Sequence, residues 1–210
     1  MPSSTKTYAV IGAVTGWFAL FLQLYLIIQN RAAISLPEII TRYFSYFTIL
    51  TNIIVALSFS IVCIHGISNK GNFFANPKTL TATAVYITIV ALVYNVILRF
   101  LWMPQGWDRV ADELLHLIIP VVFIIFWLKF VPKKEIHWKH ILLWTTYPIL
   151  YLIYTLFRGP SAQWYPYPFL NVVTLGYSKV LINSAMVTVA FVIVSIIFIG
   201  LAKMMSRRSD

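Results

Sequence analysis

The amino-acid sequence predicts an all-helical integral membrane protein, a single domain over residues 1–210 with six transmembrane helices in one bundle. Two observations carry this prediction. Of the 210 residues, 60% are hydrophobic and only 10% are charged, against about 25% charged in soluble domains, and the mean hydropathy is +0.83. The chain also contains six apolar runs of the length that a helix needs to cross about 30 Å of hydrocarbon.

The six apolar runs lie between clusters of polar residues. Strand-like alternation is absent, so each run must satisfy its backbone hydrogen bonds as a helix. The first run is followed by Gln29, Asn30 and Arg31 rather than by a small-residue cleavage site, which indicates a retained helix and not a signal peptide. The predicted spans are 8–28, 43–64, 80–100, 114–131, 141–157 and 181–201.

The distribution of basic residues predicts that both termini are cytoplasmic. With the N-terminus inside, ten of the 16 Lys and Arg residues fall on the inner side, which is the positive-inside pattern. We interpret the net charge of +10 as an anchor against anionic lipid headgroups rather than as a nucleic-acid site. The ten inner residues are Lys6, Lys70, Lys78, Lys129, Lys133, Lys134, Lys139, Lys203, Arg207 and Arg208.

The composition also excludes several functional classes. Six spans use more than half of the chain, which leaves no room for an extramembrane Rossmann or P-loop module. The single Cys63 excludes a disulfide within the chain and a metal site of the CxxC type. No internal repeat points to an inverted-repeat transporter. We expect no cofactor, membrane lipids as partners, and no nucleic acid.

Polar side chains share one face of the second predicted span. Ser45, Thr48, Thr51 and Asn52 follow one another at i, i+3, i+6 and i+7. A polar group in hydrocarbon is costly, so these residues are informative. Thr48 lies about 7 Å inside the predicted outer boundary. Its hydroxyl is a candidate nucleophile, with Thr51 one turn away as the alternative, although a membrane Thr more often bonds its own helix backbone.

The third and fourth predicted spans add ionisable groups at the same level. Asn95 and Arg99 are i, i+4 neighbours near the outer end of the third span. Asp112, Glu113 and His116 occupy the first turn of the fourth span and the start of the next. The imidazole lies about 6 Å inward, so it can face the same cavity as the hydroxyl of the second span. A hydroxyl nucleophile and its general base require such a placement.

Two further patterns compete for a role. Glu113 and His116 have the Glu-x-x-His spacing of metal sites in helical bundles, but those sites use two copies, so we expect no metal. The last outer segment is aromatic, and Pro166 and Pro168 keep it extended, which suits a lid at the membrane interface. The side chains that would frame an entrance for an acyl chain are Trp164, Tyr165, Tyr167 and Phe169.

Three separated motifs resemble the bacterial Pr6Pr membrane proteins. They are Arg-Tyr-Phe-Ser-Tyr-Phe-Thr-Ile-Leu-Thr-Asn over 42–52, Asp-Glu-Leu-Leu-His-Leu-Ile-Ile-Pro over 112–120, and Trp-Tyr-Pro-Tyr-Pro-Phe-Leu over 164–170. In pattern and span count the resemblance covers nearly the whole chain. It implies a six-helix fold in a bacterial inner membrane.

A more distant likeness bears on function. The chain is similar to the androgen-induced and androgen-dependent membrane hydrolases of animals in Tyr46-Phe47-Thr48 and in His116-Leu-Ile-Ile-Pro120. The resemblance implies a hydrolase that cleaves fatty acid esters of hydroxy fatty acids, with Thr48 as nucleophile and His116 as its base.

The remaining polar residues would support this chemistry. Asp112 or Glu113 would orient the imidazole, and Asn52, Asn95 or Arg99 would stabilise the oxyanion. Two other functions stay open from the sequence. One is a transporter or channel in which the ionisable cluster binds a substrate or relays protons. The other is a lipid-binding membrane protein without chemistry.

Overall fold

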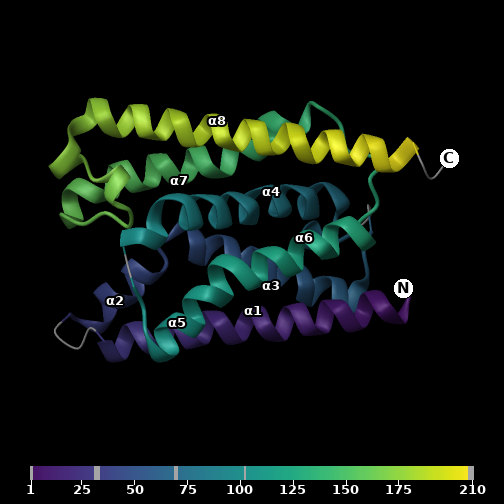
Figure 1. Ribbon diagram of the computed structural model, residues 1–210, viewed down its shortest axis with the longest axis horizontal. Helices are drawn as coiled ribbons and strands as arrows, with labels where there is room; N and C mark the ends of the chain where they lie inside the picture. Colours follow the sequence, from purple (N-terminus) through teal and green to yellow (C-terminus); the bar gives the residue numbers. More distant parts are fainter. Residues whose placement is uncertain (1, 31–33, 69–70, 102, 208–210) are drawn as a thin grey trace.

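The computed structural model describes residues 2–30, 34–68, 71–101 and 103–207, and within them it is all-helical, with 85% helix and no strand. Six helices are long and apolar enough to cross a membrane, which confirms the predicted number. The helices run roughly side by side, and the start of the first and the end of the last lie at the same end of the bundle (Figure 1).

Several of the spans are built from more than one helical segment. The third consists of α4 with a π-helical turn and a 3₁₀ turn, and the fourth of α5, a second π-helical turn and α6. In chain order the segments are α1 (Ser3–Asn30), α2 (Leu36–Tyr43), α3 (Phe47–His65), η1 (Phe73–Ala75), α4 (Pro77–Val93), η2 (Tyr94–Leu98), η3 (Arg99–Leu101), α5 (Gly106–Glu113), η4 (Leu114–Ile118), α6 (Ile119–Phe130), α7 (His140–Ala162), η5 (Pro168–Leu170) and α8 (Val172–Arg207).

The second span begins later than the sequence predicts. A short amphipathic helix, α2, carries Pro37 in its first turn and ends at Tyr43, and the chain turns before α3 starts at Phe47. The predicted start at residue 43 is therefore wrong. The turn between α2 and α3 is largely apolar, so by composition it could not be told apart from the span that follows. Ser45 lies in this turn and not on the face of α3, and its Oγ donates to the carbonyl of Thr41 at 2.6 Å.

The fourth span begins earlier than predicted, at Gly106 instead of residue 114. Its first helix, α5, is polar on one side, which lowers its mean hydropathy although the segment is helical. Asp112 and Glu113 consequently lie in the last turn of α5 and not in the first turn of the span. Asp112 is buried, with 8% of its surface exposed.

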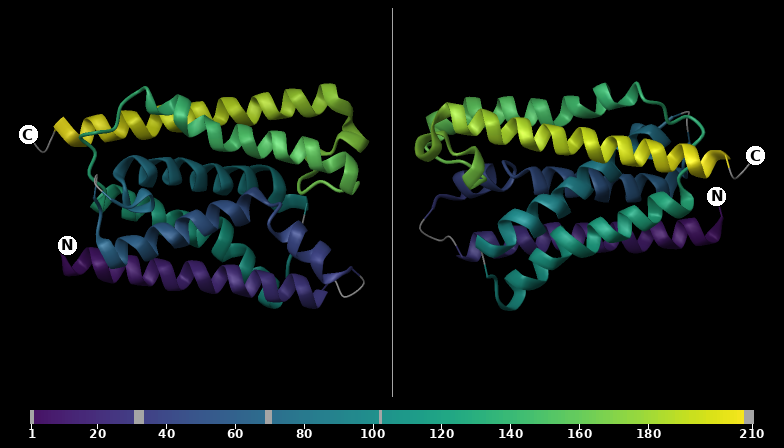
Figure 2. Two further views of the ribbon diagram at one scale, coloured as in Figure 1. Left: turned by 180° about the vertical axis from the view of Figure 1, so that it is seen from behind. Right: turned by 45° about the horizontal axis from the view of Figure 1, so that its top comes forward.

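Helix α4 lies at the centre of the bundle and packs against α3, α6 and α8. In Figure 1 it separates the pair α7 and α8 from α1, α3, α5 and α6, and Figure 2 shows the same layers from two other sides. Residues 80–87 are buried without exception. Its polar groups are satisfied internally: Thr81 Oγ1 donates to the Pro77 carbonyl and accepts from Trp127 Nε1 at 2.9 Å.

Small residues bring α1 and α3 into close contact. Gly12 faces the ring of Phe59, and Gly16 faces Ala56. A Cβ at Gly12 would lie 2.6 Å from the ring carbons, so only glycine permits this approach. Close packing of small residues is a principal source of helix association in membranes, where burial of apolar surface contributes little.

Large apolar side chains cover the outer faces of the bundle. Phe21 on α1, Leu142 and Phe157 on α7 and Ile193 on α8 are each more than half exposed. An apolar exterior of this kind is typical of helices that contact lipid. The orientation of the termini across the membrane stays a prediction.

Candidate functional site

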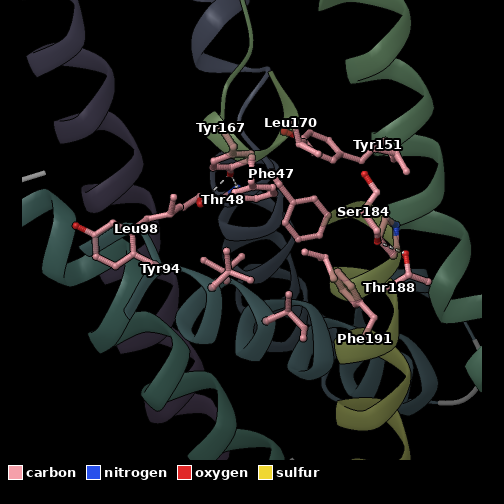
Figure 3. A pocket seen from close by; sticks show the side chains of 17 residues that line it. Phe47, Thr48, Tyr94, Leu98, Tyr151, Tyr167, Leu170, Ser184, Thr188 and Phe191 are labelled. Carbon is pink, nitrogen blue, oxygen red and sulfur yellow. Dashed lines mark hydrogen bonds between the residues drawn. The ribbon is translucent and has the colours of Figure 1, made fainter. Parts of the chain in front are cut away.

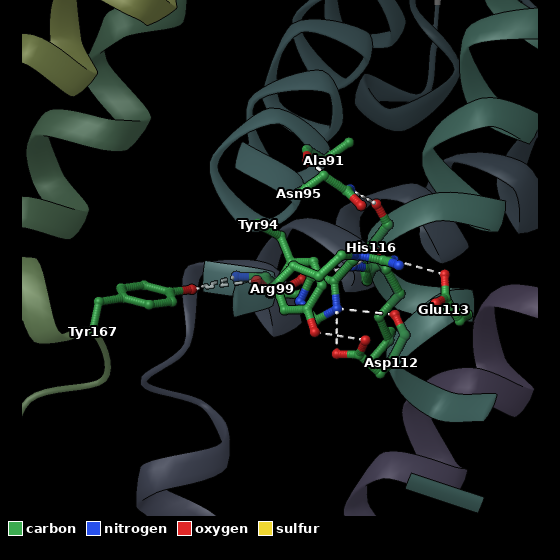
Figure 4. Close-up of polar contacts among 11 residues, drawn as sticks. Ala91, Tyr94, Asn95, Arg99, Asp112, Glu113, His116 and Tyr167 are labelled. Carbon is green, nitrogen blue, oxygen red and sulfur yellow. Dashed lines mark hydrogen bonds and ion pairs between the residues drawn. The ribbon is translucent and has the colours of Figure 1, made fainter. Parts of the chain in front are cut away.

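Two π-helical turns face each other at the end of the bundle away from the free ends of α1 and α8. η2 interrupts the third span, and η4 interrupts the fourth. A π-helical turn contains one residue more than an α-helical turn and is frequent at functional sites. Here the two turns bring Tyr94 of η2 against His116 of η4, with the ring centroids 3.7 Å apart and the planes at 12° (Figure 4).

His116 and Tyr94 share the carboxylate of Asp112. The Tyr94 hydroxyl donates to Oδ2 at 2.6 Å, and Nδ1 of His116 lies 3.1 Å from Oδ1. The same Nδ1 lies 2.9 Å from the backbone carbonyl oxygen of Asp112. Both carboxylate oxygens are thus engaged in the arrangement that Figure 4 draws.

These contacts determine the tautomer of a neutral His116. The carboxylate and the carbonyl are both acceptors, so Nδ1 must carry the hydrogen. Nε2 then has a free lone pair, and no described residue donates a hydrogen bond to it. An imidazole fixed by a carboxylate at one nitrogen and unprotonated at the other has the arrangement of a general base.

Two asparagine side chains hold the π-helical turn that carries His116. Asn52 Nδ2 donates to the carbonyls of Thr48 and Leu115 at 2.9 and 3.3 Å. Asn95 Nδ2 donates to the carbonyls of Ala91 and His116 at 2.8 and 3.1 Å. Both amide donors are therefore engaged with the backbone, and an oxyanion role for either residue stays a prediction.

Arg99 and Glu113 form an ion pair at the rim of the site. Nη2 of Arg99 lies 2.8 Å from Oε2 of Glu113, and both side chains are partly exposed. The guanidinium also lies over the Tyr94 ring, 5.7 Å from its centroid. Glu113 thus pairs with arginine, and the carboxylate that contacts the imidazole is that of Asp112.

Thr48 lies in the first turn of α3 and contacts Tyr167. Its backbone N–H donates to the Tyr167 hydroxyl at 3.1 Å, and the two side-chain oxygens are 3.3 Å apart. Burial raises the pKa of Tyr167 to about 12, so its hydroxyl is protonated at neutral pH. No hydrogen bond joins Thr48 to His116 in the part of the chain that the structure describes.

Thr48 and His116 nevertheless line the same cavity, which we call the polar cavity. Its volume is about 400 Å³, and Asp108, Asp112 and Tyr94 also contribute to its wall. An adjoining cavity of about 80 Å³, the apolar cavity, lies among α4, α7 and α8 (Figure 3). The two cavities share four wall residues, namely Thr48, Tyr94, Leu98 and Tyr167.

The aromatic segment 164–169 contributes unequally to the two cavities. Tyr167 lines both, and Phe169 lines the apolar cavity. Tyr165 is buried and packs on Gly159 of α7. The ring of Trp164 contacts the guanidinium groups of Arg42 and Arg158, which lie 5.1 and 5.5 Å from its centroid. Trp164 and Tyr165 therefore line neither cavity.

The hydroxyl of Thr51 lies elsewhere. Its Oγ1 is 3.2 Å from the Tyr147 hydroxyl, and the residue has no exposed surface. Thr51 lines neither cavity. Of the two threonines that the sequence leaves open as nucleophile, Thr48 is thus the one on a cavity wall.

Sequence reasoning missed Tyr94 and the direct contact of Tyr167 with Thr48. A signal for Tyr94 exists, because a tyrosine inside a membrane span needs a partner for its hydroxyl. The partner itself depends on which helices are neighbours. Among the described residues, no group of three or more His, Cys, Asp or Glu side chains is arranged to hold a metal ion.

Comparison of the chain with models of protein families, with curated proteins and with solved structures found no match. The resemblances to the Pr6Pr proteins and to the animal hydrolases stay predictions from the sequence motifs.

Proposed function

We propose that this protein is a membrane-embedded ester hydrolase with Thr48 as nucleophile and His116 as general base. One observation carries the proposal: His116, held at Nδ1 by Asp112 and free at Nε2, lines the same polar cavity as the Thr48 hydroxyl. A base oriented by a carboxylate and a hydroxyl on one cavity wall are the parts that acyl transfer needs.

The reaction follows from these roles. Nε2 of His116 takes the proton of Thr48 Oγ1, which attacks the ester carbonyl carbon, and the alcohol leaves with that proton. Water, activated by the same imidazole, then releases the acid and restores the threonine. Asp112 stabilises the imidazolium at each step, and no step needs a cofactor.

Tyr167 has a defined part in this proposal. Thr48 Oγ1 contacts its hydroxyl in the present structure, so the nucleophile must turn toward His116 when substrate enters. Hydrogen bonds of a catalytic group often form only in the substrate complex. The Tyr167 hydroxyl, which still accepts from the Thr48 N–H, can then donate to the oxygen of the reacting carbonyl.

The surroundings favour a lipid-like ester. The apolar cavity adjoins Thr48 and is lined mainly by side chains such as Val90, Leu152 and Phe191, which suit an acyl group. With the termini cytoplasmic, the site would lie at the outer side of the bacterial inner membrane, where a lipid can enter from the bilayer.

A fluorophosphonate probe tests the proposal, because it reacts with the activated nucleophile of a hydrolase and the variants identify which side chain it labels. The purified protein in detergent is compared with Thr48→Ala, His116→Ala and Thr51→Ala. We expect labelling to be lost in the first two variants. Thr51→Ala is the matched control. It also removes a threonine hydroxyl from α3, but Thr51 lines neither cavity, so this variant should label like the parent.

Two results would contradict the hydrolase. One is a folded parent, monodisperse and helical by circular dichroism, that does not label at all. The other is labelling that persists in Thr48→Ala.

The Tyr94–Asp112–His116 hydrogen-bonded chain also suits a proton relay in a transporter. In that case uptake by proteoliposomes would depend on Asp112, and labelling would be absent.

A further inference from the structure

The polar cavity has an excess of negative charge. Asp108 and Asp112 both line it, and no Lys or Arg of the described residues does. Both carboxylate oxygens of Asp108 accept from Nδ2 of Asn30, at 3.1 and 3.2 Å. This donor is neutral, so it satisfies hydrogen bonds without compensating the charge.

Three basic side chains around the site have acidic partners. Arg99 pairs with Glu113 at 2.8 Å. Arg42 pairs with Glu38 at 2.8 Å, and Arg158 approaches the same carboxylate at 3.8 Å. The charged groups on the cavity wall itself are therefore its two carboxylates, of which Asp112 is shared with His116 and lies within electrostatic reach of Arg99. An anion that entered would meet repulsion, and a cation would meet attraction.

The cavity wall is also rich in aromatic rings. Tyr43, Tyr46 and Tyr167 line it, together with Tyr94, whose ring already stacks on His116 and lies under the Arg99 guanidinium. The hydroxyl of Tyr43 donates to the Leu20 carbonyl at 2.8 Å, which fixes the position of that ring. Tyr46 meets Tyr167 edge to face, with the centroids 5.8 Å apart. Aromatic walls combined with carboxylates are the arrangement that recognises alkylammonium groups.

The volume of the cavity fits a ligand of this kind. About 400 Å³ lies within the range of roughly 300–1,000 Å³ that is usual for small-molecule sites. An alkylammonium group is weakly hydrated compared with a metal ion, so it can leave water for a wall of rings and two carboxylates. A metal ion would need a closer set of oxygen ligands.

We propose that the polar cavity binds a small organic cation, an alkylammonium group held between Asp108 and the tyrosine rings. This inference deepens the proposed function and rests on it for one step: the cation would be the alcohol part of the ester, with the acyl part in the apolar cavity. The substrate class then differs from the one that the resemblance implies, because the free carboxylate of a hydroxy fatty acid would face Asp108 and Asp112.

Binding of choline to the purified full chain in a neutral detergent tests the inference without any need for catalysis. Isothermal titration compares choline with 3,3-dimethylbutan-1-ol, which has the same shape and no charge. We expect choline to bind at least about tenfold more tightly, which corresponds to about 1.4 kcal/mol.

The variants separate the cavity charge from the overall charge. Asp108→Asn keeps the shape of the side chain and should weaken choline binding by about tenfold or more. Glu135→Gln removes the same charge outside the cavity, where Glu135 pairs with Lys78 at 3.2 Å, and should leave the affinity unchanged. Choline is an alcohol and not an ester, so its binding is measured independently of hydrolysis.

Three outcomes would overturn the inference in a protein that is folded by circular dichroism and monodisperse. They are an absence of choline binding, equal binding of the neutral analogue, and equal losses in Asp108→Asn and Glu135→Gln. Choline binding in a protein that the fluorophosphonate does not label would instead refute only the hydrolase and support the cation site.

Discussion

The hydroxyl of Tyr94 offers a direct test of the site's geometry. It donates to Oδ2 of Asp112 at 2.6 Å, a short bond to a carboxylate whose other oxygen faces His116. Tyr94→Phe removes the donor and keeps the ring that stacks on the imidazole. A hydrogen bond to a charged group contributes about 1.5–3 kcal/mol. Because Asp112 lines the polar cavity, water can replace part of the bond, so we expect a loss of about 1.5–2 kcal/mol.

The assay is thermal unfolding of the purified protein in detergent. At roughly 2–4 °C per kcal/mol for a chain of this size, the melting temperature should fall by about 3–8 °C. Tyr25→Phe is the matched control, because Tyr25 is 59% exposed, and it should change stability by less than about 0.5 kcal/mol.

A double-mutant cycle of Tyr94→Phe with Asp112→Asn isolates the pair. The two changes should be non-additive by about 1 kcal/mol or more, as expected for residues in direct contact. Equal melting temperatures for Tyr94→Phe and Tyr25→Phe, or additive effects in the cycle, would refute the hydrogen-bonded arrangement on which the tautomer of His116 depends.

Three other predictions concern packing, pH and the π-helical turns. Gly12→Ala should destabilise the protein by about 1–3 kcal/mol, because its Cβ would meet the Phe59 ring. Gly200→Ala is the control: its Cβ meets nothing within 4 Å, so it should stabilise the protein slightly. Shifts of the melting temperature in the same direction for both variants would contradict this prediction. Burial lowers the pKa of Lys133 from 10.5 to about 8, so the folded chain loses this proton before the unfolded chain does. Stability should rise as the pH increases from about 8 to 10.5, and it should rise less in Lys133→Met; parallel pH profiles would refute the burial effect. Asn95→Leu leaves the backbone carbonyl of His116 in η4 without its donor and should lower the free energy of unfolding by about 1–3 kcal/mol. An unchanged melting curve would contradict this prediction.

The sequence predicts the helical spans well because each span must be long and apolar whatever its neighbours are. The depth of a residue is less secure, because the count along the helix depends on where the span begins. The common depth predicted for Thr48 and His116 is counted from residues 43 and 112, whereas α3 begins at Phe47 and the fourth span at Gly106. That both residues line the polar cavity is therefore a finding of the structure. Their chemical roles stay predictions.

Contacts between helices are less accessible from one sequence. That Tyr94 meets Asp112 depends on η2 packing beside α5, and that Tyr167 meets Thr48 depends on the path of the last outer segment. Neither follows from hydropathy. The error at Ser45 has a similar origin, because an apolar turn between α2 and α3 has the composition of a span although its backbone is not helical.

The π-helical turns also change how the two interrupted spans must be compared with other sequences. Each contains one residue more than a regular helical turn of the same height. The residue numbers of side chains on one face of the helix are therefore offset by one between the segments before and after the turn. Removal of one residue from Leu114–Ile118 would restore a continuous α-helix and keep Phe123 and Trp127 in the core, while it would withdraw His116 from the polar cavity. A chain that aligns with this one except for a single gap at that place would therefore share the bundle without the site.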